Sequence, residues 1–125
     1  MTSDPSDTST STYEQEVLAA LMDEWSEEQR ARCERNAKRR LREKNLGPFD
    51  IERVEMLRAL KKETRAEIDK HRLSPFYNGG SGRLAHSDDW DSDGLCHHLL
   101  ARYPKVPAAT MRWFVSWAIY HDYLR

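Results

Sequence analysis

The chain has 125 residues, of which 38% are hydrophobic and 33% charged, and its net charge is −1. A chain of this length forms one small domain, with or without an extension, and buries only a modest core. Two widely separated cysteines exclude a disulfide-rich scaffold and favour reduced thiols in a cytoplasmic protein. No secretory signal is recognisable, and no apolar run approaches the roughly 18 residues of a membrane span.

The near-neutral total hides a separation of charge along the chain. Residues 1–29 contain eight acids and neither Lys nor Arg, whereas residues 30–50 contain eight bases and three acids. Residues 51–72 have two more bases than acids, and the remainder is balanced. A basic segment that follows an acidic one indicates a surface for a polyanion, or a tail that folds back over such a surface.

Residues 1–11 are expected to form a disordered acidic tail, because small polar residues cannot offset the entropy of ordering. A long helix follows. Thr12 and Gln15 match a capping box at its start, and Pro48 supplies its stop, so the helix runs about thirty residues. Its apolar stripe is dense at first and then continues only at Cys33, Ala37 and Leu41.

The second half of this helix carries a row of arginines on the side away from the apolar stripe. The residues recur at i, i+3, i+7 and i+10 and therefore share one face. They are Arg32, Arg35, Arg39 and Arg42. Such a row is commonly a solvated surface, and the alternative is contact with the phosphates of a nucleic acid.

Asp50 suits the N-cap of a second helix, which we expect from Ile51 to Arg72. Its inward positions are Ile51, Val54, Leu57, Lys61, Thr64, Ile68 and His71. The linker before it is short, so residues 12–72 are expected to form an antiparallel helical hairpin. We expect His71 to pack in the seam of this hairpin rather than to bind a ligand.

Residues 73–91 interrupt the helical pattern and predict a flexible loop. Pro75 ends the second helix, and residues 78–82 read Asn-Gly-Gly-Ser-Gly. These glycines do not make a phosphate-binding loop, because no Gly-Lys-Ser/Thr sequence follows them. Phe76, Tyr77 and Leu84 are expected to pack the loop against the C-terminal helices.

Residues 89–94, Asp-Trp-Asp-Ser-Asp-Gly, match the first half of a calcium-binding loop. The second half fails, because Leu100 stands where a bidentate Glu closes the coordination shell. The same residues suit the start of a helix, with Asp91 or Ser92 as the N-cap. We predict the helix start and leave calcium binding by Asp89, Asp91 and Asp93 as the alternative.

The C-terminal half is also rich in histidine. His86, His97, His98 and His121 carry atoms suited to zinc binding or general-base chemistry. Their spacing does not support such a site, because no pair recurs at i, i+4 and neighbouring His97 and His98 diverge on a helix. We predict no enzyme, no cofactor and no metal. The alternative to this prediction is an enzyme whose active site is built from His86, His98, His121 and residues 89–93.

Residues 92–125 are expected to contain two helices, from Ser92 to Tyr103 and from Pro107 to Leu124, joined by a proline-bounded turn. The stretch 100–115 resembles the helix-turn-helix modules of DNA-binding proteins. Ala101 matches the small residue of the first helix, and Val106 matches the apolar residue that closes the turn. The apolar anchors of the second helix correspond to Met111, Phe114 and Val115.

The resemblance covers residues 95–118 and implies a C-terminal helix-turn-helix corner that contacts DNA. Lys105 and Pro104 depart from the family pattern, which usually has Gly and an apolar residue at these positions. Of the positions that would read bases, Arg112 is the one able to make a charged contact. Arg102 and Lys105 are the flanking candidates for phosphate contact.

The last helix is apolar on two sides. Trp113, Trp117, Tyr120 and Leu124 lie on the side away from Met111 and Phe114. We expect this side to be covered by the core. If it is uncovered, Trp113, Trp117 and Tyr120 form a patch suited to a protein partner or a second copy of the chain.

These patterns together predict an all-α protein with a long N-terminal helical hairpin and a C-terminal helical corner. The expected function is association with nucleic acid through Arg32, Arg35, Arg39 and Arg42, with the corner as a second contact. The alternative is a non-enzymatic adaptor or inhibitor that binds another protein through the hairpin or through the aromatic side of the last helix.

Overall fold

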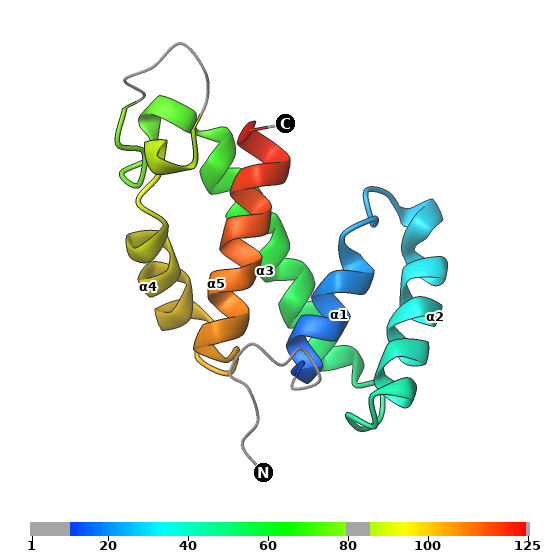
Figure 1. The fold of residues 1–125 in the computed structure, drawn as a ribbon. Coiled ribbons are helices and arrows are strands. Elements are labelled where there is room, and N and C mark those ends of the chain that lie inside the picture. Colours follow the sequence, from blue (N-terminus) through cyan, green and yellow to red (C-terminus); the bar gives the residue numbers. More distant parts are fainter. Residues whose placement is uncertain (1–10, 80–85, 125) are drawn as a thin grey trace. The chain divides into compact units, whose positions relative to one another are not determined.

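The computed structural model describes residues 11–79 and 86–124, and within these residues the chain is helical and contains no strand (Figure 1). The predicted all-α class is therefore confirmed. The helices are α1 (Tyr13–Leu21), α2 (Glu27–Glu43), α3 (Ile51–Asp69), α4 (Ser92–Arg102) and α5 (Ala108–Ile119). None of the helices in the described residues combines the length and apolar character that a bilayer span requires.

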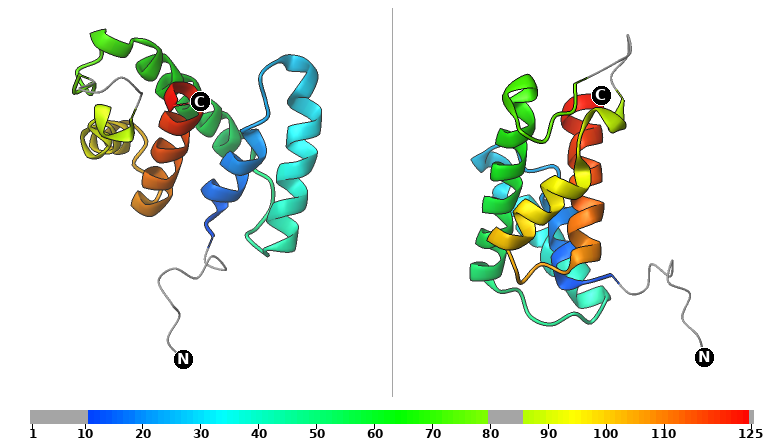
Figure 2. Two further views of the ribbon diagram at one scale, coloured as in Figure 1. Left: turned by 45° about the horizontal axis from the view of Figure 1, so that its top comes forward. Right: turned by 90° about the vertical axis from the view of Figure 1, so that its left-hand side faces the viewer.

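The chain divides into two compact units, Met1–Asp50 and Ile51–Arg125. In the first unit, α1 and α2 lie side by side as a short helical hairpin (Figures 1 and 2). Val17 and Leu21 of α1 and Ala37 and Leu41 of α2 are fully buried. The sequence predicts a hairpin between a helix over residues 12–45 and a second helix over residues 51–72, and that hairpin stays a prediction. The hairpin of α1 and α2 is a different one, because both of its helices lie within the segment for which the sequence predicts a single helix.

The prediction of a single helix of about thirty residues is wrong, because the chain leaves the helical conformation after Leu21 and enters it again at Glu27. The side-chain oxygen of Gln29 accepts hydrogen bonds from the backbone N–H groups of Trp25, at 2.6 Å, and Ser26, at 3.1 Å. These bonds satisfy backbone donors at the start of α2. The sequence Ser26-Glu-Glu-Gln29 is a capping box and marks this helix start.

The C-terminal end of α2 is closed by a Schellman motif. Asn45 adopts the left-handed conformation, with φ 55°, and its N–H donates to the carbonyl of Arg42. The N–H of Leu46 donates to the carbonyl of Leu41 at 2.9 Å. Gly47 follows with φ 105°, a conformation that favours glycine. The turn after α2 therefore has a defined shape.

In the second unit, α5 packs against both α3 and α4. Figure 2 shows these three helices from two further sides. The predicted inward positions of α3 are confirmed at Val54, Leu57, Thr64 and Ile68. The prediction is wrong at Ile51, which is 48% exposed, and at His71, which lies in an exposed 3₁₀ turn over His71–Leu73.

The segment between α3 and α4 packs against the C-terminal end of the chain, where α5 continues into a π-helical turn over Tyr120–Leu124. Tyr77 and Trp90 form an isolated antiparallel bridge, and the Tyr123 ring lies 5.6 Å from Trp90. The Phe76 ring lies 5.3 Å from His98. The expected packing of Phe76 and Tyr77 is confirmed, whereas Leu84 and the predicted tail up to residue 10 lie outside the described residues.

Candidate nucleic-acid interface

The four arginines predicted to form one face of a helix are exposed on α2. We call Arg32, Arg35, Arg39 and Arg42 the basic face. The opposite side of α2 carries its buried residues, Cys33, Ala37 and Leu41. The amphipathic pattern of α2 thus places the small apolar residues inward and leaves the arginines in solvent.

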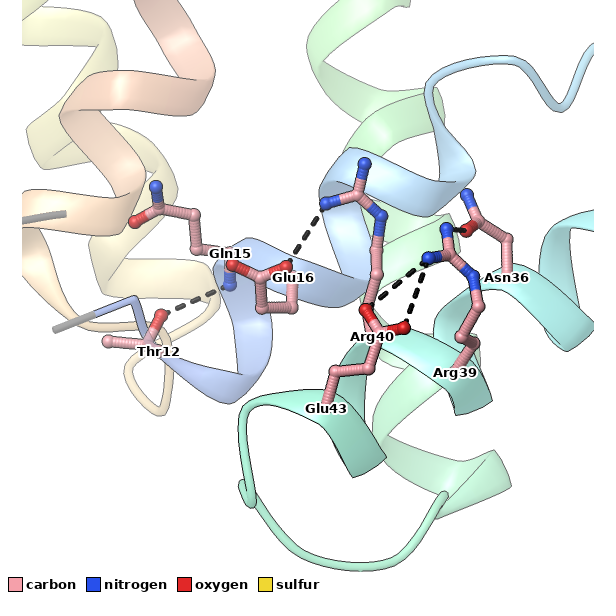
Figure 3. Close-up of polar contacts among 7 residues, drawn as sticks. All are labelled: Thr12, Gln15, Glu16, Asn36, Arg39, Arg40 and Glu43. Carbon is pink, nitrogen blue, oxygen red and sulfur yellow. Dashed lines mark hydrogen bonds and ion pairs between the residues drawn. The ribbon is translucent and has the colours of Figure 1, made fainter. Parts of the chain in front are cut away.

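The members of the basic face differ in their partners. Within the described residues, Arg32, Arg35 and Arg42 have neither an ion pair nor a side-chain hydrogen bond. Arg39 lies 3.3 Å from Glu43 and donates a hydrogen bond of 2.6 Å to Asn36 (Figure 3). Its side chain nevertheless remains 52% exposed. Such an exposed pair within one helix is weak, so Arg39 can exchange Glu43 for another anion.

Arg40 stands beside this face in the sequence but points to α1. Its guanidinium lies 3.1 Å from the carboxylate of Glu16, whose side chain is only 6% exposed (Figure 3). This ion pair joins the two helices of the first unit. One arginine of the run is therefore structural, and the spacing of the basic residues alone does not reveal which one.

A pocket of about 420 Å³ adjoins the C-terminal end of the basic face, and sequence analysis did not predict it. It is lined by Lys38, Leu41, Arg42, Asn45, Gly47, Pro48 and Phe49. The ammonium nitrogen of Lys38 lies 5.0 Å from the centre of the Phe49 ring, which is half-buried. We call this the Lys38–Phe49 pocket. The sequence signal that could have indicated it is an aromatic residue directly after the basic helix and its Gly-Pro turn.

The basic residues predicted near the C-terminal corner are less available. Arg102 forms an ion pair with Glu63 of α3, and the Tyr103 hydroxyl donates to the same carboxylate at 2.8 Å. The hydrogen bond to Glu63 raises the pKa of Arg102. Arg112 is 70% exposed and lies 3.5 Å from Asp93, and Lys105 is exposed in the turn between α4 and α5. DNA contact by Lys105 and Arg112 stays a prediction of the helix-turn-helix resemblance.

The aromatic side of α5 is partly covered. Trp113 and Trp117 are half-buried, and the Trp117 ring stacks on His121, with 4.7 Å between centroids. Tyr120 is 59% exposed. The three residues predicted as a partner surface therefore differ in exposure, and binding of a protein partner stays a prediction.

The aspartates of the calcium half-motif have different partners. Asp91 accepts a hydrogen bond from the Gly94 N–H at 2.9 Å and caps α4, as predicted. Asp89 accepts hydrogen bonds from the Tyr123 hydroxyl, at 2.6 Å, and the His86 N–H, at 3.0 Å. These bonds lower the pKa of Asp89. Asp93 lies beside Arg112. Within the described residues, no three His, Cys, Asp or Glu side chains are placed to hold a metal ion.

The histidines considered for catalysis also have separate surroundings. The ring of His98 lies near Phe76, whereas His121 stacks on Trp117. His86 lies 3.5 Å from Asp88, and both side chains are largely exposed. His97 is exposed on α4.

The chain was compared with protein-family models, with curated proteins and with solved structures, and none of the three comparisons finds a match.

Proposed function

We propose that the protein binds the phosphate backbone of nucleic acids through the basic face of α2. The proposal is carried by one observation: Arg32, Arg35 and Arg42 are exposed on the same side of the helix and have no acidic partner within the described residues. Like charges at this spacing repel one another. A polyanion relieves the repulsion, and its binding releases condensed counterions.

Arginine is well suited to this role, because its planar guanidinium donates several hydrogen bonds in a geometry that matches phosphate. From Arg32 to Arg42 the face extends about 15 Å, at about 1.5 Å per residue of helix. That length allows contact with several phosphates. Contacts to phosphates hold the backbone but carry no base information, so we expect binding that is strongly salt-dependent and weakly sequence-dependent.

The test is fluorescence anisotropy with labelled nucleic acids over a series of salt concentrations. We expect the triple variant Arg32→Glu, Arg35→Glu, Arg42→Glu to bind at least about tenfold more weakly than the parent. The slope of log K against log salt should fall by about 2 to 3, because each lost phosphate contact removes about 0.7 to 0.9 from the slope.

A matched control carries the same change of charge on the second unit. Lys62, Arg65 and Arg72 are exposed, and their replacement by glutamate alters net charge equally. The control should keep most of the affinity. Equal losses in the two triple variants would indicate a bulk effect of charge, and parental binding by the α2 variant would refute the proposal.

A further inference from the structure

The Lys38–Phe49 pocket combines three features that suit one ligand. Arg42 belongs both to the pocket and to the basic face, so a backbone held by that face passes the mouth of the pocket. Lys38 supplies a second cation there, and Phe49 supplies an aromatic ring. Single-stranded nucleic acids are bound by this pairing of cations for phosphates with aromatic rings for bases.

On this basis we propose that the pocket stacks an unpaired base of a single-stranded nucleic acid on Phe49 while Arg42 and Lys38 hold the adjacent phosphate. The inference rests on the proposed binding of phosphates by the basic face and adds the class of nucleic acid. Bases in a duplex are stacked on one another and paired, so a duplex cannot place a base on the ring without being opened. The protein then prefers single strands to duplexes.

The volume of the pocket and the fixed backbone of its wall suit this occupant. A volume of about 420 Å³ lies within the range of about 300 to 1,000 Å³ that is common for small-molecule sites. The wall after α2 is held by the Schellman motif at Asn45 and by the left-handed conformation of Gly47. Because these backbone conformations are fixed without a ligand, little ordering of the turn is required when a base enters.

Lys38 is the side chain that moves on binding. Its ammonium lies over the Phe49 ring, where a base would stack. The Lys38 side chain is exposed and flexible, and its cation over the half-buried ring contributes less to affinity than a stacked base does. The ammonium therefore leaves the ring for a phosphate, and the base takes its place.

The experiment measures the affinity of the full chain for oligothymidylate, oligouridylate and a mixed-sequence duplex by fluorescence anisotropy. Phe49→Leu keeps an apolar side chain in the wall of the pocket but removes the aromatic face, and Phe49→Trp keeps an aromatic face. We expect Phe49→Leu to weaken binding of the single strands about tenfold. Its duplex affinity and salt slope should equal those of the parent, because no phosphate contact is lost.

Retained or increased single-strand affinity in Phe49→Trp supports the inference, because an indole ring also stacks a base. Equal binding of single strands and duplex by the parent, or parental single-strand affinity in Phe49→Leu, overturns the stacking of a base but leaves the phosphate proposal intact. Absence of salt-dependent binding to all three probes overturns both. Thymidylate and uridylate differ at the 2′-hydroxyl and also at the C5 methyl group of the base, so oligodeoxyuridylate is measured beside them. The difference between oligodeoxyuridylate and oligouridylate then identifies the preferred strand as DNA or RNA.

Discussion

Asp91 shows how one side chain decides where a helix begins. Its carboxylate accepts a hydrogen bond from the Gly94 N–H, one of the backbone donors that the first turn of α4 leaves without an intrahelical partner. We predict that Asp91→Ala lowers the free energy of unfolding by about 1 kcal/mol, whereas Asp91→Ser keeps most of the stability. Urea denaturation followed by tryptophan fluorescence measures both values.

The serine variant is the control, because its hydroxyl can also accept the Gly94 N–H. Equal losses in the two variants would show that Asp91 stabilises α4 by its charge near the helix N-terminus and not as an acceptor.

The neighbouring aspartates differ from Asp91 in their partners: Asp89 accepts a hydrogen bond from Tyr123, and Asp93 lies beside Arg112. Asp89, Asp91 and Asp93 thus have three different roles, although the calcium half-motif would make all three of them metal ligands.

At the level of helices, the ion pair of Glu16 and Arg40 joins α1 to α2 across a sequence separation of 24 residues. Because Glu16 is nearly buried, its bond to Arg40 is less screened by solvent than an exposed pair. We predict a coupling free energy of about 1 kcal/mol in a double-mutant cycle of Glu16→Gln and Arg40→Gln. Chemical denaturation of the parent, the two single variants and the double variant measures this coupling.

Arg39 and Glu43 provide the control cycle, since they form an ion pair at i, i+4 with both side chains more than half exposed. Such pairs contribute about 0.3 to 0.5 kcal/mol. If the Glu16–Arg40 cycle gives no more than this, the pair does not hold the two helices together.

The helices could be predicted from sequence where local signals dominate. Asp91 caps α4, and the apolar spacing of α3 identifies Val54, Leu57 and Ile68 as buried. The C-terminal end of α3 is less well predicted, because the helix ends at Asp69 and not at Arg72. The apolar periodicity continues from α1 into α2 and predicts one helix, whereas the helix-start signal at Ser26 marks where α2 begins. The basic face followed from spacing alone, whereas the pairing of Arg40 with Glu16 and the pocket beside Phe49 depend on tertiary packing.

At the scale of the molecule, the carboxylates of the described residues whose pKa values are lowered, Glu63, Glu67 and Asp89, lie in the second unit. Burial alone would raise the pKa of Glu63, but hydrogen bonds from Tyr103 and Arg102 lower it. The same balance holds at Glu67, where Ser74 and Lys70 are the donors. The charge of His98 lowers both pKa values further. These bonds stabilise the ionised carboxylates in the folded state.

A carboxylate with a lowered pKa in the folded state contributes stability that is complete above its unfolded pKa, here 4.5, and is lost as the pH falls through the folded value. We therefore predict that the free energy of unfolding decreases below about pH 4.5.

The double variant Tyr103→Phe, Ser74→Ala removes one hydrogen-bond donor from the carboxylate of Glu63 and one from that of Glu67. This variant should be less stable than the parent at pH 7, with a difference that shrinks as the pH falls below 4.5. Urea denaturation across this range measures both profiles. Parallel profiles would show that the two hydroxyls stabilise the protein by packing, without favouring the charged carboxylates.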